Sequence, residues 1–261
     1  MLANFLLRDG HSALVRGGLK LNVNASNQSD FVAIERERVH LEYERRAREV
    51  SPDLYAPWQP SFQFIHGGRI RAATTMLHRL SVFPKPGDQC LEVGFGALGW
   101  LSELIGWGVS ESDLHGIELD PSRARSARGI LPLADLRTGD AVKLPWDDNK
   151  FHLVITSTLF TSILDSRVRQ LIADEIQRVL APGGALLWYD FAYNNPRNPN
   201  VRGIRRRELR QLFPKLEGKV KTVTLAPPLA RSIAPISWTL ATFLEAIPFL
   251  RTHLLAVLTK S

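Results

Sequence analysis

Cysteine is almost absent from this chain of 261 residues. The single one, Cys90, has no partner for a disulfide, so a fold held together by disulfides is excluded. One cysteine also excludes the structural zinc sites that are built from several cysteines, and we expect no metal centre. Chains without disulfides are typical of reducing compartments, so we expect a cytoplasmic protein.

Long apolar runs are also missing. Residues 1–20 carry Arg8, Asp9, His11 and Arg16 between short apolar pieces, so we expect no secretory signal peptide. No stretch reaches the roughly 20 apolar residues that a membrane-spanning helix needs. Internal repeats and low-complexity segments are absent as well. Because 44% of the residues are apolar, the composition fits one α/β domain with a smaller attachment.

Positive charge is in excess, with a formal net charge of +7, and much of this excess lies in residues 202–210. Such a charge permits binding to nucleic acid, to an anionic membrane surface or to an acidic substrate. Aromatic residues are not interleaved with these arginines, and no recognisable RNA-binding module is appended. Nucleic acid is therefore the less favoured partner, although it is not excluded.

The N-terminal part predicts an irregular segment followed by helices. Residues 1–30 show little hydrophobic periodicity, and asparagine and serine are frequent over 22–29, so we expect an irregular start. A helical cap is expected over 31–86. Its first helix would be capped by Asp30, and its second would cover 67–82.

From residue 87 onward, apolar strand patterns alternate with helical patterns. This alternation predicts a parallel sheet with helices on both of its faces. Ligands of such sheets bind beyond the carboxyl ends of the strands. The expected strands are 90–93, 113–119, 133–138, 151–157, 185–191, 220–225 and 253–259, and the expected helices are 98–107, one from Pro121, 166–180 and an apolar stretch at 228–247.

A glycine-rich turn follows the first of these strands. Gly94, Gly96 and Gly99 have the spacing of a dinucleotide-binding turn, and Glu118 follows at about the distance expected for a residue that accepts bonds from ribose hydroxyls. Both NAD and S-adenosylmethionine contain such a ribose. The turn alone therefore leaves the ligand open.

Three later segments narrow the choice. Gly139-Asp140-Ala141, then residues 144–154, then residues 178–184 stand in an order that, with the glycine turn, resembles the motifs of the class I S-adenosylmethionine-dependent methyltransferases. The resemblance covers residues 89–191. It implies S-adenosylmethionine as the cofactor, bound by a domain over 87–261. It also implies a doubly wound, seven-stranded, mostly parallel sheet whose last strand is antiparallel.

The resemblance further implies a set of cofactor-binding residues. Glu118 would accept bonds from the ribose hydroxyls, Asp140 would receive the adenine amino group, and Glu92 would orient the amino group of the methionine part. The sequence departs from the family at Leu98, where a third glycine is frequent, and at His152, where an aspartate is frequent. The complete set is Glu92, Gly94, Gly96, Gly99, Glu118, Leu119, Asp140, Ala141, Thr156 and Ser157.

Methyl transfer from a sulfonium needs an acceptor lone pair aligned behind the methyl group, and an acceptor hydroxyl benefits from a base. Asp190 and Tyr193, at the end of the fifth expected strand, are the candidates for catalysis. Asp190 as a cap of the following loop is an equally good alternative. The candidates for acceptor binding come from the break before residue 60, the loop after the fifth strand and the apolar stretch; they are Tyr55, Trp58, Asn194, Asn195, Arg197, Arg202 and Arg231.

We therefore expect a methyltransferase that acts on a small-molecule, sugar or lipid-linked acceptor, at an oxygen atom. One alternative is an RNA methyltransferase. A second is a non-catalytic protein that keeps the fold and docks on a membrane or a partner through residues 228–247. A third, an NAD dehydrogenase, predicts stabilisation by NADH and none by S-adenosylmethionine. The oligomeric state is left open.

Overall fold

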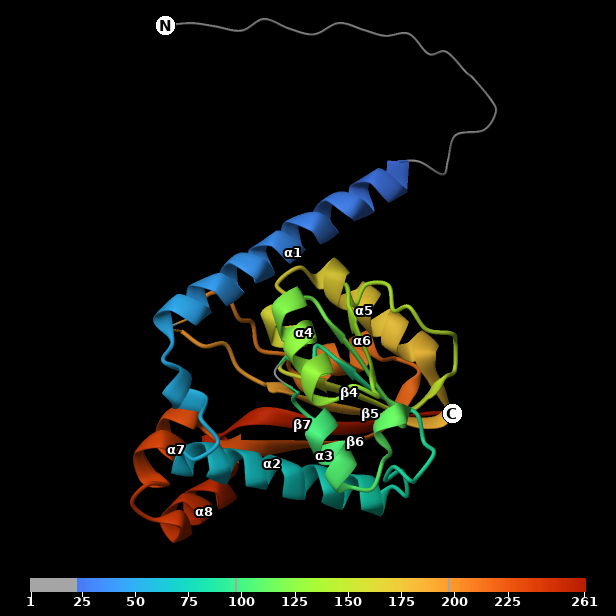
Figure 1. The fold of residues 1–261 in the computed structure, drawn as a ribbon. Helices are drawn as coiled ribbons and strands as arrows, with labels where there is room; N and C mark the ends of the chain where they lie inside the picture. The colour runs from blue at the N-terminus through green and yellow to red at the C-terminus, as the bar shows by residue number, and fades with distance from the viewer. Residues whose placement is uncertain (1–22, 97, 197) are drawn as a thin grey trace, which may run out of the picture.

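The computed structural model describes residues 23–96, 98–196 and 198–261. Its centre is a seven-stranded sheet in the order β3-β2-β1-β4-β5-β7-β6 (Figure 1). Only β7 runs antiparallel to its neighbours, so the predicted doubly wound fold with an antiparallel last strand is confirmed. The strands are β1 (Cys90–Val93), β2 (Leu114–Glu118), β3 (Asp135–Thr138), β4 (Phe151–Ser157), β5 (Leu180–Phe191), β6 (Leu216–Leu225) and β7 (Arg251–Lys260).

Helices cover both faces of this sheet. α2, α3 and α4 pack on one face, and α5 and α6 pack on the other, with α1 beside them. None of the helices in the described ranges combines the length and the apolar composition needed to cross a membrane. The helices are α1 (Val23–Glu49), α2 (Pro60–Arg79), α3 (Leu101–Gly106), α4 (Pro121–Ile130), α5 (Ser166–Val179), α6 (Arg206–Leu212), α7 (Pro227–Ile233) and α8 (Trp238–Ala246), and the 3-10 turns are η1 (Pro52–Tyr55), η2 (Glu111–Asp113), η3 (Phe160–Ser162) and η4 (Pro248–Leu250).

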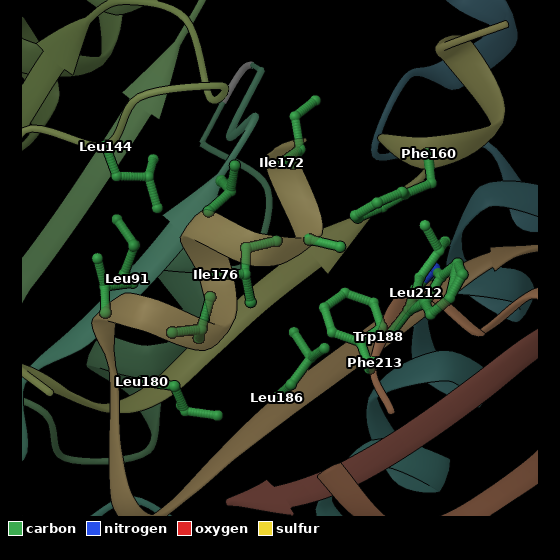
Figure 2. Packing of buried hydrophobic residues seen from close by; sticks show 14 of the residues in the cluster. Leu91, Leu144, Phe160, Ile172, Ile176, Leu180, Leu186, Trp188, Leu212 and Phe213 are labelled. Carbon is green, nitrogen blue, oxygen red and sulfur yellow. The ribbon is translucent and has the colours of Figure 1, made fainter. Parts of the chain in front are cut away.

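The core on the α5 face follows directly from helical spacing. Ile172 and Ile176 of α5 are four residues apart and buried, and they lie over β4 and β5 (Figure 2). Beyond them, Phe160, Trp188 and Phe213 form a cluster of aromatic rings. Each fully buried isoleucine contributes roughly 1.5–3 kcal/mol to stability. This packing holds the carboxyl ends of β4 and β5 in place.

Two helix starts differ from the expectation. α1 begins at Val23, so the segment expected to be irregular over 23–29 is helical, and Asp30 lies inside the helix and does not cap it. The strong helix formers that follow extend the helix through residues of weak propensity. α2 begins at Pro60 and not at Gly67. Proline suits the first position of a helix because its missing N–H has no partner there anyway.

The apolar stretch 228–247 forms two helices and not one. Pro235 lies between α7 and α8, where its ring and its missing N–H oppose a continuous helix. Ser237 then caps α8, because its side chain accepts a hydrogen bond from the Leu240 amide. The two short helices connect β6 to β7.

The expected helical cap is divided between the two faces. α1 crosses the α5 side of the molecule, where the Glu35 carboxylate accepts a hydrogen bond from the Leu164 amide. α2 belongs to the layer on the opposite face, where Ala73 and Met76 join the core around β1 (Figure 1). The proposed division of the chain at residues 30 and 86 stays a prediction.

Candidate functional site

A cavity lies at the carboxyl edge of the sheet, next to the point between β1 and β4 where the strand order reverses. Such switch points are the usual ligand sites of open α/β sheets. The cavity has a volume of about 50 Å³ and is lined from the ends of β1, β2 and β3, from η3 and the residues beside it, and from α1 and α5. Five of the residues predicted to bind the cofactor share it, namely Gly94, Glu118, Leu119, Asp140 and Ala141.

The glycine turn after β1 adopts the conformation that its sequence requires. Gly94 has φ +74° and Gly96 has φ +56°, both in the left-handed region that favours glycine. A Cβ atom at Gly94 would lie 3.0 Å from the Leu159 side chain, whereas one at Gly96 would meet nothing within 4 Å. Leu98 is also left-handed, with φ +75°. The turn therefore keeps a third left-handed residue at a position where the sequence lacks the third glycine.

Gly99 has a different task from the other glycines. A Cβ atom there would lie 2.2 Å from Oε1 of Glu92, so the position makes room for that carboxylate. Oε2 of Glu92 accepts hydrogen bonds from the amides of Trp100 (2.8 Å) and Leu101 (3.1 Å). Burial raises the pKa of Glu92 to about 8, against these two hydrogen bonds and the charge of Arg69, which lower it. Glu92 thus joins β1 to the start of α3.

Glu118 links the glycine turn to β2. Its Oε2 accepts a hydrogen bond from the Gly96 amide at 2.8 Å, and its Oε1 accepts one from the Asp120 amide at 3.0 Å. Asp140, across the cavity, accepts a hydrogen bond from the Val142 amide at 3.1 Å. Two carboxylates held by backbone amides therefore border the same cavity.

Thr156 and Ser157, the predicted neighbours of the sulfonium, lie on opposite faces of the sheet because successive strand residues alternate. Thr156 is buried on the α5 face beside Trp188, and its hydroxyl has no hydrogen-bond partner. Ser157 is half-buried and receives a long hydrogen bond of 3.4 Å from the guanidinium of Arg69. The two predicted residues therefore do not share one contact surface.

Arg69 of α2 is a candidate site residue that the sequence analysis did not identify. Its guanidinium lies 4.7 Å from the Trp100 ring centre and 5.4 Å from that of Tyr189. It contacts His66 at 3.1 Å, and its Nε is buried without a partner. None of the hydrogen bonds or ion pairs found among the described residues joins it to a carboxylate. A guanidinium held in this way is suited to bind an anionic group.

A signal for Arg69 is present in the sequence. The residue lies four positions before Ala73 and seven before Met76, so it shares the helix face that packs in the core. A charged residue on a core-facing stripe is unusual unless it has a partner.

α1 supplies two more side chains that the sequence analysis missed, Val39 and Tyr43, which line the cavity. The guanidinium of Arg123 lies 4.4 Å from the centre of the Tyr43 ring. Polar contacts hold α1 in this position, since Arg38 donates to the Ser162 carbonyl and Glu42 accepts from the Asn200 side chain. Local spacing gives no signal for these contacts, because each joins α1 to a segment more than 70 residues away.

Asp190, a predicted catalytic residue, is buried in a network of its own. It accepts hydrogen bonds from the amide and hydroxyl of Thr161 and from the Phe191 amide. Burial raises the pKa of Asp190 to about 6, although these hydrogen bonds lower it. The carboxylate fastens η3 to the end of β5, while the side chain of Tyr193 is exposed. A catalytic role for the two residues stays a prediction.

The predicted acceptor-binding residues fall into separate groups. Arg231 of α7 lies 5.8 Å from the Tyr55 ring centre, and Trp58 nearby in the sequence is exposed. Arg202, by contrast, pairs with Glu208 on the α5 and α6 side.

Two asparagines stabilise the loop after β5. The Asn194 side chain accepts a hydrogen bond from the Gly203 amide at 2.9 Å, and the Asn195 carbonyl accepts one from Asn198. Arg197 lies outside the described residues. Other residues of the loop bond to its surroundings, since Asn200 donates to Glu42 of α1 and the Arg202 amide donates to the Thr161 carbonyl of η3.

Part of the chain is similar in sequence to known methyltransferases. Residues 90–184 match the model of a methyltransferase domain family. The phthiotriol/phenolphthiotriol dimycocerosates methyltransferase of Mycobacterium tuberculosis is 32% identical over 128 residues, which are 48% of this chain and 46% of that protein. The sterol 4-C-methyltransferase of Caenorhabditis elegans is 29% identical over 114 residues, 41% of this chain and 32% of the relative. The matches thus span less than half the length of these relatives.

Solved structures share the fold at low sequence identity. A structure described as a putative sarcosine dimethylglycine methyltransferase, from Galdieria sulphuraria, has a TM-score of 0.57 at 15% identity and covers 73% of this chain and 84% of its own. A geranyl diphosphate methyltransferase in complex with S-adenosylmethionine has a TM-score of 0.56 at 16% identity and covers 80% of this chain and 94% of its own.

Proposed function

We propose that this chain is a class I S-adenosylmethionine-dependent methyltransferase, since its residues 90–184 match a methyltransferase domain family, and that it transfers a methyl group from S-adenosylmethionine to an apolar small molecule or lipid. The observation that carries this proposal is the shared cavity at the switch point of the sheet. Glycine backbone, two carboxylates and apolar side chains meet there, and these groups suit a nucleoside with an amino-acid tail.

The residues present fit this cofactor. Glu118 is suited to the ribose hydroxyls and Asp140 to the adenine amino group, while Gly94 and Gly96 leave space for the methionine part. We assign the methionine carboxylate to Arg69, because its guanidinium has donors to spare and lies near Glu92. Glu118 and Asp140, which line the cavity, thus correspond to the ribose and the adenine amino group, and Arg69, which lies outside the cavity lining, corresponds to the carboxylate.

The cavity itself is too small for this ligand as it stands. Ligand sites are commonly about 300–1,000 Å³, against the 50 Å³ between the strand ends and α1. Cofactor binding on this proposal displaces the side chains that cover the cavity, namely Val39, Tyr43 and Leu159. Val39 belongs to the core cluster on the α5 face and Tyr43 packs against it, so this displacement exposes apolar area that the bound cofactor covers again.

The proposed reaction needs few chemical groups from the protein. The bound cofactor supplies a methyl group on a positively charged sulfur, which is already activated for transfer. α1 closes the cavity and excludes water, and η3, held by Asp190, positions the end of β4. We propose Asp190 as a positioning residue and Tyr193, which is exposed at the same edge, as a contact to the acceptor.

The acceptor class follows from the names of the relatives. Three of them name a sterol, norajmaline and a dimycocerosate, whereas a fourth names glycine, sarcosine and dimethylglycine, which are small polar acceptors; our proposal of an apolar acceptor follows the first three. The names also specify transfer to carbon in one case and to nitrogen in another. Oxygen as the acceptor atom here is our prediction from the sequence and depends on the substrate.

Calorimetric titration with S-adenosylhomocysteine tests the cofactor. We expect Glu118→Gln to weaken binding at least tenfold, because a neutral amide cannot accept from both ribose hydroxyls. Glu217→Gln, an exposed acid on β6, is the matched control and keeps the affinity. Stabilisation by NADH and not by S-adenosylhomocysteine would make the chain a dehydrogenase and overturn the proposal.

Transfer of labelled methyl groups tests the acceptor. We expect label in an organic extract of lipids and other apolar molecules. Label in tRNA or rRNA, together with a salt-dependent gel shift, would instead identify an RNA methyltransferase. Cofactor binding without turnover on any acceptor would leave a non-catalytic binding protein.

A further inference from the structure

The small unit formed by α7, α8 and η4 exposes several large apolar side chains to solvent. Its contact with Phe64 of α2 is built from buried Ala230, Ala234 and Ala241, together with Leu225, and the partly buried Leu229, Ile233, Leu244 and Leu250 pack against this cluster. Other large apolar side chains of the unit face solvent. They are Ile236, Trp238, Leu240, Phe243 and Phe249, of which Ile236, Phe243 and Phe249 are 84%, 67% and 81% exposed.

The outward face of α8 also lacks charge. The helix contains one charged residue, Glu245, whose carboxylate accepts a hydrogen bond from the Leu225 amide at 3.2 Å. The exposed positions of α8 are taken by threonine, leucine, phenylalanine, tryptophan and alanine. A helix face in permanent contact with water is normally polar, so this face is suited to a partner that removes it from water.

This apolar surface lies at the same edge of the sheet as the cavity. β6 is parallel to β5, so its end at Leu225 is a carboxyl end, and α7 starts two residues later. β7 begins at Arg251 after η4 and pairs through His253 with Phe191, the last residue of β5. Residues 226–250 therefore project from the edge at which β1, β4 and β5 end (Figure 1).

Shape and charge favour a lipid bilayer over a second copy of the chain. Ile236 lies in the turn between two helices and Phe249 in a 3-10 turn, so both are protruding tips. On the face of the sheet that α8 also contacts, Lys219 and Lys221 alternate in register with Val223 and are exposed. Lys221 and Lys219 lie four and six residues before Leu225, roughly 13 and 20 Å behind this edge, so they add a long-range attraction to an anionic bilayer and are not part of the apolar surface.

We propose that residues 236–250 dock on an anionic lipid bilayer, so that the catalytic edge faces the membrane from which an apolar acceptor is drawn. This inference rests on the proposed methyl transfer to a lipid or apolar molecule. Trp238 suits the headgroup level of a bilayer, and the neighbouring Leu240, Phe243 and Phe249 suit the acyl boundary.

Flotation of the full chain with vesicles tests the docking. We expect binding to vesicles of 30% phosphatidylglycerol in phosphatidylcholine, and weaker binding to pure phosphatidylcholine. The double variant Phe243→Ser/Phe249→Ser is expected to lose at least tenfold in affinity. The matched control is Ile130→Ser/Leu133→Ser, whose residues are 64% and 71% exposed at the opposite edge, and it keeps the wild-type affinity.

Three outcomes would overturn the docking proposal. The wild type could leave all vesicles unbound, or the two double variants could bind equally. Alternatively, sedimentation could show a dimer that Phe243→Ser/Phe249→Ser converts to a monomer, which would make a second copy the occupant. Titration of the same preparations with S-adenosylhomocysteine distinguishes failure of the docking proposal from failure of the proposed function. A wild type that does not bind S-adenosylhomocysteine counts against methyl transfer, whereas the vesicle result still decides the docking.

Discussion

The carboxyl edge of the sheet has two halves, one at β1, β2 and β3 and the other at β5 and β6, and they are built in different ways. In the half formed by β1, β2 and β3, the chain turns directly after β1 and β2 into α3 and α4, and the carboxylates of Glu92 and Glu118 accept hydrogen bonds from backbone amides at these turns. In the half formed by β5 and β6, long connections follow, at residues 192–205 and 226–250, and large apolar side chains face outward.

The difference matches the ligands that we assign to the two halves. A cofactor of fixed shape is served by a rigid frame, in which the position of each carboxylate is fixed by the backbone beside it. An acceptor is served by long loops, which tolerate changes in length and sequence. Substitutions in the first half should therefore act on the cofactor, and substitutions in the second should act on the acceptor.

The sharpest test compares two arginines, one from each half. Arg69→Ala is expected to weaken the binding of S-adenosylhomocysteine by tenfold to about a hundredfold, because it removes charge-assisted hydrogen bonds worth roughly 1.5–3 kcal/mol. Arg231→Ala, its counterpart in α7, is expected to leave this affinity unchanged and to raise KM for the acceptor. Calorimetry and steady-state kinetics give the two numbers.

The assignment of Arg69 has its own control ligand. 5′-Methylthioadenosine lacks the amino-acid part, so it should bind equally well to the wild type and to Arg69→Ala. Arg71→Ala removes an exposed arginine from the same helix and should change neither affinity. If Arg69→Ala weakens both ligands to the same degree, Arg69 acts on the fold of the site and does not hold the carboxylate.

Gly99 and Gly203, one in each half of the edge, allow the two halves to be compared in stability. A Cβ atom at Gly99 would meet the Glu92 carboxylate, and one at Gly203 would lie 2.4 Å from the backbone carbon of Tyr193. Both alanine variants are expected to lose about 1–3 kcal/mol in urea unfolding, since neither neighbour has free space. Gly99→Ala should also weaken S-adenosylhomocysteine binding, and Gly203→Ala should not.

Gly129→Ala is the matched control for these variants, because a Cβ atom there meets nothing within 4 Å and the residue lies in α4. It is expected to gain about 0.5–1 kcal/mol. Loss of cofactor affinity in Gly203→Ala would erase the division of the edge into two halves.

Two buried carboxylates, Glu92 in one half and Asp190 in the other, are expected to make the stability of the protein depend on pH in different ranges. The pKa of Glu92 rises from 4.5 to about 8 on folding, so the folded state holds a proton that the unfolded state has released. Its contribution to stability is present in full below pH 4.5 and is lost as the pH rises through about 8. We expect Glu92→Gln to remove a fall on the order of 2 kcal/mol between pH 6 and 8.

Asp190 provides the comparison in the other half. Its pKa rises to about 6 on folding, so its contribution to the free energy of unfolding is lost at lower pH, between about 4 and 6. Urea unfolding of the wild type, Glu92→Gln and Asp190→Asn at several pH values measures the two difference curves. If Glu92→Gln follows the wild type between pH 6 and 8, Glu92 is ionised in the folded protein.

The sequence predicted the cofactor half of the edge better than the acceptor half. The positions of Gly94, Glu118 and Asp140 were predictable because each depends on a local pattern at the end of a strand, whereas the doubly wound sheet with its antiparallel last strand was implied by the family resemblance. Arg69 and Tyr43 were not identified, because they reach the site from helices that precede the glycine turn. Contacts between distant segments depend on packing, for which one sequence gives little signal.

The acceptor half was predicted less well for the same reason. Residues 228–247 were expected to form one helix, although Pro235 marks the break. The predicted acceptor residues were chosen from one loop and one stretch, but Arg202 pairs with Glu208 on one side of the sheet and Arg231 lies beside Tyr55 on the other. Composition indicated that these loops matter and gave no information on how their side chains face.

The position of α1 has a consequence for the speed of the reaction. Val39 and Tyr43 line a cavity too small for a nucleoside, so if the cofactor binds there as we propose, we expect each exchange of product for fresh cofactor to include an opening and a closing of this cover. Motions of this kind take microseconds to milliseconds and set the turnover rate of many enzymes. We therefore expect the hydrogen bonds that join Glu35, Arg38 and Glu42 of α1 to η3, to the residues after it and to the loop after β5 to influence the rate of this opening.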